Sequence, residues 1–292
     1  MVYSHPVNTR GAVALCAALV LLLAGCARQQ TAESQAADEV AKLRSGLAST
    51  VPSTESTAPL AAPSEPAALA SNPIYRVKLT SPRCAEPQVE PTSLTNVRTY
   101  YTQFVACLNA AWAPAIRTAG FTFTPPKLVV VLGQSPSSPC NFADTEAYYC
   151  GGTIYIDAEY DITAEDPDVN RAWMAFLIAH EYGHHVQALT GILIAHYRLG
   201  EKLNGVDVQL QEDRRVELQA DCFSGAYLGA DRATIPIDDE WLEVWADLYS
   251  TLSDPANDHG SGEHRRHWSL TGFTAAGPGA CNTYTAASSL LG

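Results

Sequence analysis

Two histidines and a glutamate near the middle of the chain have the spacing of a hydrolytic metal site. The segment from His180 to His184 has the pattern H-E-x-x-H, with Glu181 in second place. On a helix, residues i and i+4 project from one face about a turn apart, so both imidazoles can bind one Zn²⁺. Glu181 lies about 100° around that helix, where its carboxylate can act as a general base on a water molecule beside the metal.

This spacing forms a metal site only on a helix, and the surrounding residues predict one. Residues 170–190 have helical periodicity, and Gly191 is a typical stop signal. Trp173, Phe176 and Leu177 lie one to two turns before the motif on a similar face, which indicates a buried stripe. Ionisable side chains in a buried helix need partners, and a zinc ion would supply one.

The third ligand has to come from another segment, because the extended histidine motif of metzincins is absent after His184. Glu217 and Asp221 are again four residues apart, in a mostly apolar predicted helix at 208–228. We expect Glu217 to bind the zinc. Asp221 would accept the free ring N–H of a zinc-bound histidine and so set its tautomer. His196 is the alternative third ligand.

The remaining pattern predicts an α+β fold that is mainly helical, with helices around one antiparallel hairpin. Further helices are expected at 95–119 (capped by Ser93 or Thr95), 208–228 and 239–252. Strands are expected at 128–132, 146–149 and 153–157, the last two as a hairpin around Gly151-Gly152. We expect the strand at 153–157 to be an exposed edge that pairs with an extended peptide. The last forty residues are Gly-rich, and we expect them to end in irregular structure held by Cys281.

The N-terminal residues resemble an export signal. Gly11 to Gly25 is a run of small and aliphatic residues with the length of a signal-peptide core. It ends in Leu23-Ala24-Gly25-Cys26, which resembles the lipobox of bacterial lipoproteins, whose cysteine is diacylated after the preceding segment is removed. We therefore expect residues 1–26 to be a lipoprotein signal peptide with lipidation at Cys26. The alternative is an ordinary secretory signal with an incidental cysteine.

Residues 27–72 have the composition of a tether. They contain 12 Ala, 7 Ser, 4 Thr and 4 Pro, and no aromatic residue. Such a segment cannot bury enough apolar area to offset the entropy lost on ordering. We expect a disordered linker here and a folded domain at 73–292, exported and held at a membrane on its extracytoplasmic side.

The cysteine count also favours export. Outside the predicted signal peptide and its Cys26 six cysteines remain, and an even number in an exported domain suggests three disulfides. The pairs that we expect are Cys84–Cys107, Cys140–Cys150 and Cys222–Cys281, the alternative being that some are buried free thiols.

The charge balance excludes some partners. The chain has 18 Lys and Arg against 31 Asp and Glu, a net charge of −13. A chain this acidic does not attract phosphate backbones, so we expect no nucleic acid partner. It also has no run of about 18 apolar residues, so no transmembrane helix is expected.

Three segments together resemble a known family. They are His180-Glu181-x-x-His184-His185-Val186-Gln187, Glu217-Leu218-Gln219-Ala220-Asp221-Cys222, and His259-Gly260 followed by Arg265 and Trp268. This set is similar to the bacterial neutral zinc metallopeptidase family, and the likeness covers most of residues 73–292. The resemblance implies a zincin-like fold with a gluzincin-like ligand set of two histidines and one glutamate. Family members often carry an N-terminal membrane helix, whereas this chain resembles a lipoprotein.

The resemblance and the motif together lead to a functional expectation. Three protein ligands leave the fourth zinc position to water, which favours a metalloendopeptidase that hydrolyses envelope or extracellular proteins or peptides. His259 precedes a Gly turn and recurs in the resembling motif, so it is the candidate oxyanion stabiliser, with Tyr155 as a weaker one. The alternative function is a catalytically silent, zinc-stabilised binding lipoprotein, which would have no need of Glu181.

The other histidines have no spacing that argues for a ligand. His185 points about 100° away from the motif's histidines and is expected to be packed and hydrogen-bonded. His5, His264 and His267 are expected to be non-ligands.

Overall fold

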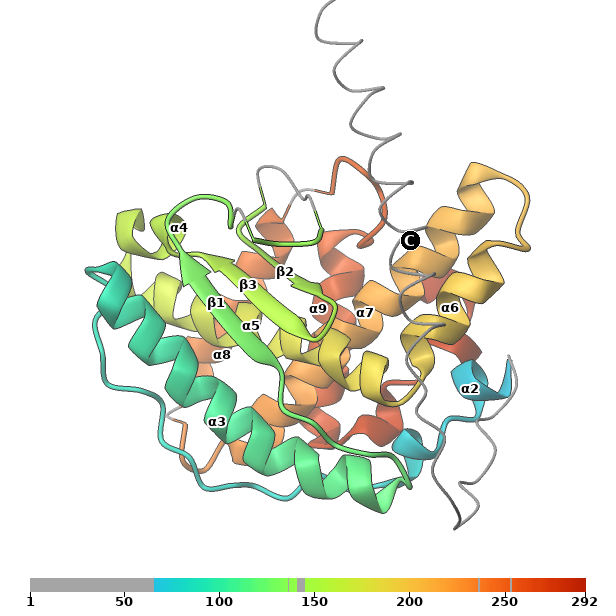
Figure 1. The fold of residues 1–292 in the computed structure, drawn as a ribbon, viewed down its shortest axis with the longest axis horizontal. Helices are drawn as coiled ribbons and strands as arrows, with labels where there is room; N and C mark the ends of the chain where they lie inside the picture. The colour runs from blue at the N-terminus through green and yellow to red at the C-terminus, as the bar shows by residue number, and fades with distance from the viewer. Residues whose placement is uncertain (1–65, 136, 141–144, 236, 253) are drawn as a thin grey trace, which may run out of the picture. The chain divides into compact units, whose positions relative to one another are not determined.

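A computed structural model describes residues 66–135, 137–140, 145–235, 237–252 and 254–292, and Figure 1 shows the fold that they form. All of these residues except 139 and 140 belong to one compact unit. The predicted signal peptide, Cys26 and residues 27–65 of the predicted linker lie outside the described residues.

The end of the predicted linker belongs to the folded unit. Residues Ala67–Ala70 form helix α2, and Leu69 is buried. The Asn72 side chain, also buried, donates hydrogen bonds to the carbonyl oxygens of Ala68 and Thr190. The packed chain therefore begins before residue 73.

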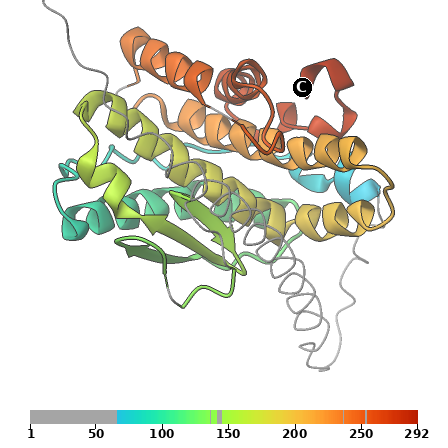
Figure 2. The same ribbon diagram turned by 90° about the horizontal axis from the view of Figure 1, so that it is seen from above.

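Helix α5 (Pro167–Leu189) is the central helix, and its middle turns are buried on nearly every side. One side packs against helix α3 (Leu94–Thr118) and the sheet, and the other against helix α7 (Val206–Asp231), as Figure 2 shows. Helices α8 (Asp239–Thr251) and α9 (Gly262–Ala275) lie beyond, on the α7 side. A helix that carries ionisable residues in this position must satisfy them inside the protein.

Local sequence signals account for most of the helix boundaries. The Ser93 side chain caps α3 by accepting a hydrogen bond from the Asn96 N–H, and Gly120 follows the helix with a positive φ of 91°. Asp238 caps α8 in the same way. The predicted helices at 95–119, 170–190, 208–228 and 239–252 are confirmed. Among the described helices, none has the length and apolar character needed to cross a bilayer.

The sheet has three strands and is mixed. Strand β3 (Thr153–Asp157) pairs in parallel with β1 (Lys127–Val131) and antiparallel with β2 (Ala147–Cys150), in the order β1-β3-β2. Gly151 and Gly152 both have positive φ, as a two-residue hairpin turn requires. The hairpin is confirmed, but the expectation that 153–157 is an exposed edge is wrong, because β3 is the central strand. The outer strand that contacts α5 is β2.

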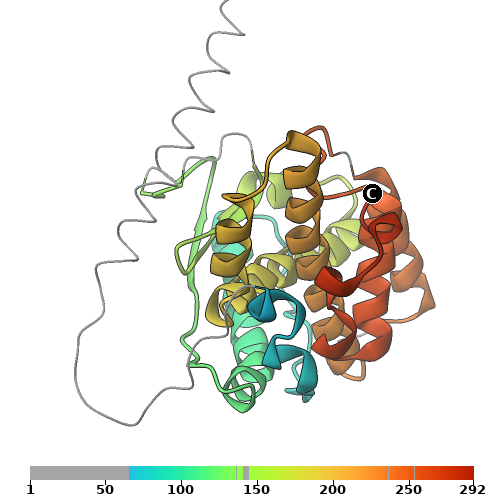
Figure 3. The same cartoon turned by 90° about the vertical axis from the view of Figure 1, so that its right-hand side faces the viewer.

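The C-terminal residues are more regular than expected. Helix α9, capped by the Ser261 side chain, packs along the whole second half of α7 (Figure 3). A β-carbon added at Gly225 would overlap the backbone oxygen of Ser269, and one at Gly272 would overlap that of Cys222. Helix α9 was not expected, because this polar, Gly-containing helix is stabilised by close backbone packing rather than by its own propensity. The chain after it has only short 3-10 turns and is tied to α7 by Cys281, so the expected irregular end is confirmed.

Disulfides connect distant segments of the domain. The predicted pairs Cys84–Cys107 and Cys222–Cys281 are both present, and the second ties α7 to the C-terminal segment. Cys140 and Cys150 are also disulfide-bonded, and their pairing with each other stays a prediction.

Candidate metal centre

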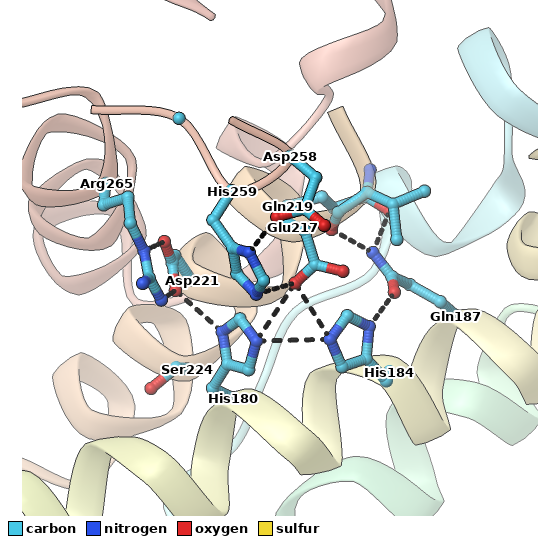
Figure 4. A network of polar contacts seen from close by, with 12 residues as sticks. His180, His184, Gln187, Glu217, Gln219, Asp221, Ser224, Asp258, His259 and Arg265 are labelled. Atoms are coloured by element: carbon cyan, nitrogen blue, oxygen red, sulfur yellow. Dashed lines mark hydrogen bonds and ion pairs between the residues drawn. The ribbon is translucent and has the colours of Figure 1, made fainter. Parts of the chain in front are cut away.

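Three side chains from α5 and α7 converge at one point, as Figure 4 shows. The Nε2 atoms of His180 and His184 are 3.2 Å apart. The Glu217 Oε2 atom lies 3.3 Å from the first and 3.2 Å from the second. The two histidines sit one turn apart on α5, and Glu217 faces them from α7. The three residues that the sequence analysis selects as ligands are therefore brought together.

A close contact between the two helices sets this convergence. A β-carbon added at Gly183 would lie 3.0 Å from the Cα and the backbone oxygen of Ala220. Gly183 lies between the two histidines in the chain, and Ala220 lies between Glu217 and Asp221. Because small residues meet at the crossing, the carboxylates of α7 come within reach of the imidazoles of α5.

The far side of the His180 ring is held by a buried carboxylate. The His180 Nδ1 atom is 2.7 Å from Asp221 Oδ1. The Arg265 side chain on α9 donates to both oxygens of Asp221, at 2.9 and 3.0 Å. Burial alone would raise the pKa of Asp221, but Arg265 and His180 lower it below its ordinary value. An ionised carboxylate only accepts hydrogen bonds, so the proton lies on His180 Nδ1 and leaves Nε2 with a lone pair.

The far side of the His184 ring is held by an amide. Gln187 donates from its Nε2 to the carbonyl oxygen of Val216, at 2.8 Å. Its Oε1 therefore faces His184 Nδ1, at 2.9 Å, and accepts a hydrogen bond from it. Gln187 in turn contacts Gln219, which donates to Tyr75 and to the backbone oxygen of Cys281. In the neutral ring, His184 Nε2 then carries the lone pair. Burial would lower the pKa of His184, but Glu217 raises it to about 9, so a proton takes this position when no cation does.

The donor set fits a zinc ion. In neutral rings, both Nε2 atoms and the Glu217 Oε2 atom present lone pairs to one another, and the buried Glu217 Oε2 has no hydrogen-bond partner among the described residues. Their separations of 3.2–3.3 Å match the edge, about 3.3–3.4 Å, of a tetrahedron with metal–ligand distances of about 2.0–2.1 Å. Without a positive charge, this arrangement would bring three electron pairs together in a desolvated place, so either a proton on the rings or a metal ion has to supply that charge.

Glu181 lies beside the donor set and is buried as well. It is 6% exposed, and its Oε2 atom has no hydrogen-bond partner within the described part of the chain. Burial raises the pKa of this carboxyl group above its ordinary value. A buried carboxylate with an unused oxygen is suited to accept a proton from a water molecule in the site.

A loop before α9 brings a third imidazole to the site. The Asp254 carboxylate accepts hydrogen bonds from three successive backbone N–H groups, those of residues 258–260, and so shapes the loop that carries His259. The His259 Nδ1 atom is 2.6 Å from Asp258 Oδ1, and its Nε2 atom is 3.4 Å from Glu217 Oε2. Burial would lower the pKa of His259, but the Glu217 and Asp258 carboxylates raise it overall.

The other residues considered from the sequence lie elsewhere. His196, the alternative third ligand, pairs with Asp213. It belongs to neither group of possible metal ligands found among the described residues, which are His180 with Glu217 and His259, and Asp254 with Asp258 and His259. Tyr155 is buried in the sheet and stacks on Tyr148. The remaining histidines within the described residues are bonded or packed: His185 to Tyr149 and Thr124, His264 to Ser261 and Ser289, and His267 against Trp268. His5 lies outside the described residues.

Several supporting residues were not assigned a role from the sequence. Gln187 and Arg265 were present in the family-like segments, but nothing in their spacing indicated what they contact. The guanidinium of Arg265 also lies 5.9 Å from the ring centre of Phe176 and 5.8 Å from that of Tyr249. A signal existed for Gln187, because it is three residues after His184 on the same helix face.

Comparison with known proteins is consistent with this geometry. The model of the family described as "Putative neutral zinc metallopeptidase" matches residues 74–244. The chain therefore belongs to this family. The matched range includes His180, His184 and Glu217, whereas His259 and Arg265 lie beyond it.

Relatives extend over much of the chain. "Uncharacterized protein YpfJ" of Escherichia coli K12 is 26% identical over 239 residues, which cover 72% of this chain and 82% of that protein. "Uncharacterized protein Rv2575" of Mycobacterium tuberculosis is 27% identical over 210 residues, which cover 62% of this chain and 68% of that protein. No solved structure matches the chain significantly.

The Gln187 contact leads to a testable prediction. Gln187→Met removes the acceptor that orients His184, so the dissociation constant for zinc should rise about 10–100-fold. Gln187→Glu keeps the acceptor for His184 but loses the hydrogen bond to Val216, so its zinc affinity should lie between those of wild type and Gln187→Met. Competition against a chromophoric chelator measures both, and Gln209→Met, on the exposed start of α7, is the control. Equal affinity in wild type and Gln187→Met would contradict the assigned contact.

Proposed function

We propose that the protein is a zinc-dependent peptidase whose metal is held by His180, His184 and Glu217. The observation that carries this proposal is the convergence of two imidazole nitrogens and a carboxylate oxygen beside Glu181, a buried carboxylate with an unused oxygen. A zinc site that served only to stabilise the fold would be closed by a fourth protein ligand and would not need a base.

The chain's own residues account for the proton transfers of peptide hydrolysis. Zinc bound there would polarise the substrate carbonyl and lower the pKa of a water molecule toward 7. Glu181 accepts a proton from the attacking water as the water oxygen bonds to the carbonyl carbon. The same group then gives a proton to the leaving nitrogen as the C–N bond breaks. Asp221 and Gln187 keep the two histidine rings in the tautomer that presents Nε2.

His259 has the placement of a transition-state stabiliser. Its side chain is 40% exposed, so it faces the open side of the site, while Asp258 fixes its ring from behind. The raised pKa of His259 favours its protonated form. This form would donate a hydrogen bond to the substrate carbonyl oxygen, which gains negative charge as the water attacks. We propose this role for His259.

Glu181→Gln tests the proposed base. The variant should keep one zinc per chain and the fold, and lose peptide cleavage by about 10²–10⁴-fold, because the amide cannot accept the proton. The measurements are zinc content by elemental analysis and turnover of a random peptide library. Glu159→Gln, exposed on helix α4 (Ala158–Thr163), is the control. Equal cleavage by wild type and Glu181→Gln rejects the base, and zinc binding without cleavage by wild type favours the silent binding protein.

His259→Gln tests the third imidazole. We expect kcat to fall about 10²–10³-fold while KM and zinc content change little, because the group acts on charge that develops only in the transition state. His267→Gln, exposed on α9, is the matched control. Loss of zinc from His259→Gln would instead identify His259 as a metal ligand.

We further propose that the enzyme works outside the cytoplasm as a lipid-anchored protein that acts on envelope or extracellular proteins or peptides. Support comes from the lipobox-like segment ending in Cys26 and from the disulfides, which persist in oxidising compartments. Cys26→Ser should abolish metabolic labelling by palmitate and move the protein from the membrane to the soluble fraction. Unchanged membrane association of this variant would reject the anchor.

A further inference from the structure

A surface cavity of about 320 Å³, open to solvent, lies near the N-terminal end of α5 and is lined by residues of α4, α5 and the C-terminal end of α8. Its apolar wall includes Trp173 of α5 together with Leu248 and Leu252 near the end of α8. None of the proposed metal ligands lines it. Its volume is large enough for one long side chain.

The cavity is aligned with the metal centre along α5. Trp173 is seven residues before His180, which places it on the same face, about 10 Å along the helix axis. The Trp173 ring packs on Phe176 at 5.4 Å, and Phe176 packs on His180 at 5.7 Å. An extended peptide covers about 10 Å in three residues. Phe176 is buried and packs on Tyr249, so protein fills the face of α5 between the two sites. A substrate bound at the metal would reach this cavity, two or three residues away, by lying along the outer strand β2, which Glu146 precedes.

The polar part of the cavity is acidic. Glu146, Glu165 and Asp166 all contribute to its lining, and none of the described lining residues is Lys, Arg or His. An aliphatic stem that ends in a cation would match both parts, because the stem packs on apolar walls and the cation meets carboxylates and an indole ring. Lysine and arginine side chains have this form.

Glu146 is the carboxylate best placed to select such a side chain. It precedes β2, the outer strand beside α5, and its Oε1 accepts a hydrogen bond of 2.7 Å from the Trp173 indole. Its environment is largely desolvated, and burial raises the pKa of Glu146 to about 7. A cation seated beside this carboxylate would stabilise its ionised form, so a basic side chain has more to gain here than a neutral one.

We propose that this cavity is a substrate subsite that binds a lysine or arginine side chain two or three residues from the bond that is cleaved. The inference rests on the proposed peptidase function and adds to it the class of substrate, namely peptides with a basic residue at a defined distance. The net charge of −13 favours the approach of such substrates as well.

Cleavage of a random peptide library, sequenced by mass spectrometry, tests the subsite. Wild type should enrich Lys and Arg at one position, and a matched arginine–citrulline peptide pair should differ by about tenfold or more in kcat/KM. Glu146→Gln retains an acceptor for Trp173 and should bring this ratio close to one. The control Glu159→Gln changes the same charge outside the cavity lining and should leave the ratio unchanged. Should Glu146→Gln not fold, Glu165→Lys at the exposed rim should lower the ratio too.

A binding arm separates failure of the subsite from failure of the enzyme proposal. Zinc-loaded Glu181→Gln is immobilised and exposed to the same library, with Glu181→Gln/Glu146→Gln as the comparison. If Glu181→Gln retains Lys and Arg peptides and Glu181→Gln/Glu146→Gln does not, the subsite is supported even if wild type cleaves nothing. Cleavage without a basic preference keeps the peptidase and rejects the subsite. If wild type cleaves no peptide and no peptide is retained in a Glu146-dependent way, both the peptidase and the subsite are rejected.

Discussion

Lone pairs that face one another in a desolvated space are the constraint on which this structure depends. Two imidazole Nε2 atoms and a carboxylate oxygen lie within 3.2–3.3 Å of each other. The Nδ1 atom of each ring already donates a hydrogen bond to a carboxylate or amide oxygen on its other side. Burial would lower the pKa of His184, but Glu217 raises it to about 9, so the cluster needs positive charge, from a proton or from a metal ion. The donor atoms match a divalent cation, and the arrangement of the surrounding helices keeps them together.

Helix α7 is the element through which most of that support passes. One of its faces supplies Glu217 and Asp221 to α5, across the Gly183–Ala220 contact. Another face, with Gly225, allows α9 to approach so closely that Arg265 reaches Asp221. The Cys222–Cys281 bridge joins the same helix to the C-terminal segment, whose carbonyl at Cys281 binds Gln219. The buried bidentate ion pair between Asp221 and Arg265, together with its aromatic neighbours, thus orients His180 on α5.

Helix α5 separates two kinds of electrostatic environment. Toward α7, His180 faces the Asp221 carboxylate, which Arg265 holds in its ionised form against the effect of burial. Toward the sheet, Glu146 and Asp161 have pKa values raised to about 7 by burial, and the charge of Glu181 contributes to the shift at Glu146. The proposed base therefore lies between a metal site and a group of carboxyl groups that have few cations near them. This difference is the physical basis for expecting basic substrate side chains on that side.

What the sequence by itself determined was local in origin. The i, i+4 spacings of His180 with His184 and of Glu217 with Asp221, the cap at Ser93, and the hairpin at Gly151-Gly152 all depend on residues within one or two turns of each other. Two disulfide pairings were also foreseen. The position of β3 at the centre of the sheet, the existence of α9, and the contacts of Gln187 and Arg265 were decided only by the tertiary structure. They depend on which backbones can approach one another, and residues that are far apart in the chain carry no periodic signal of that approach.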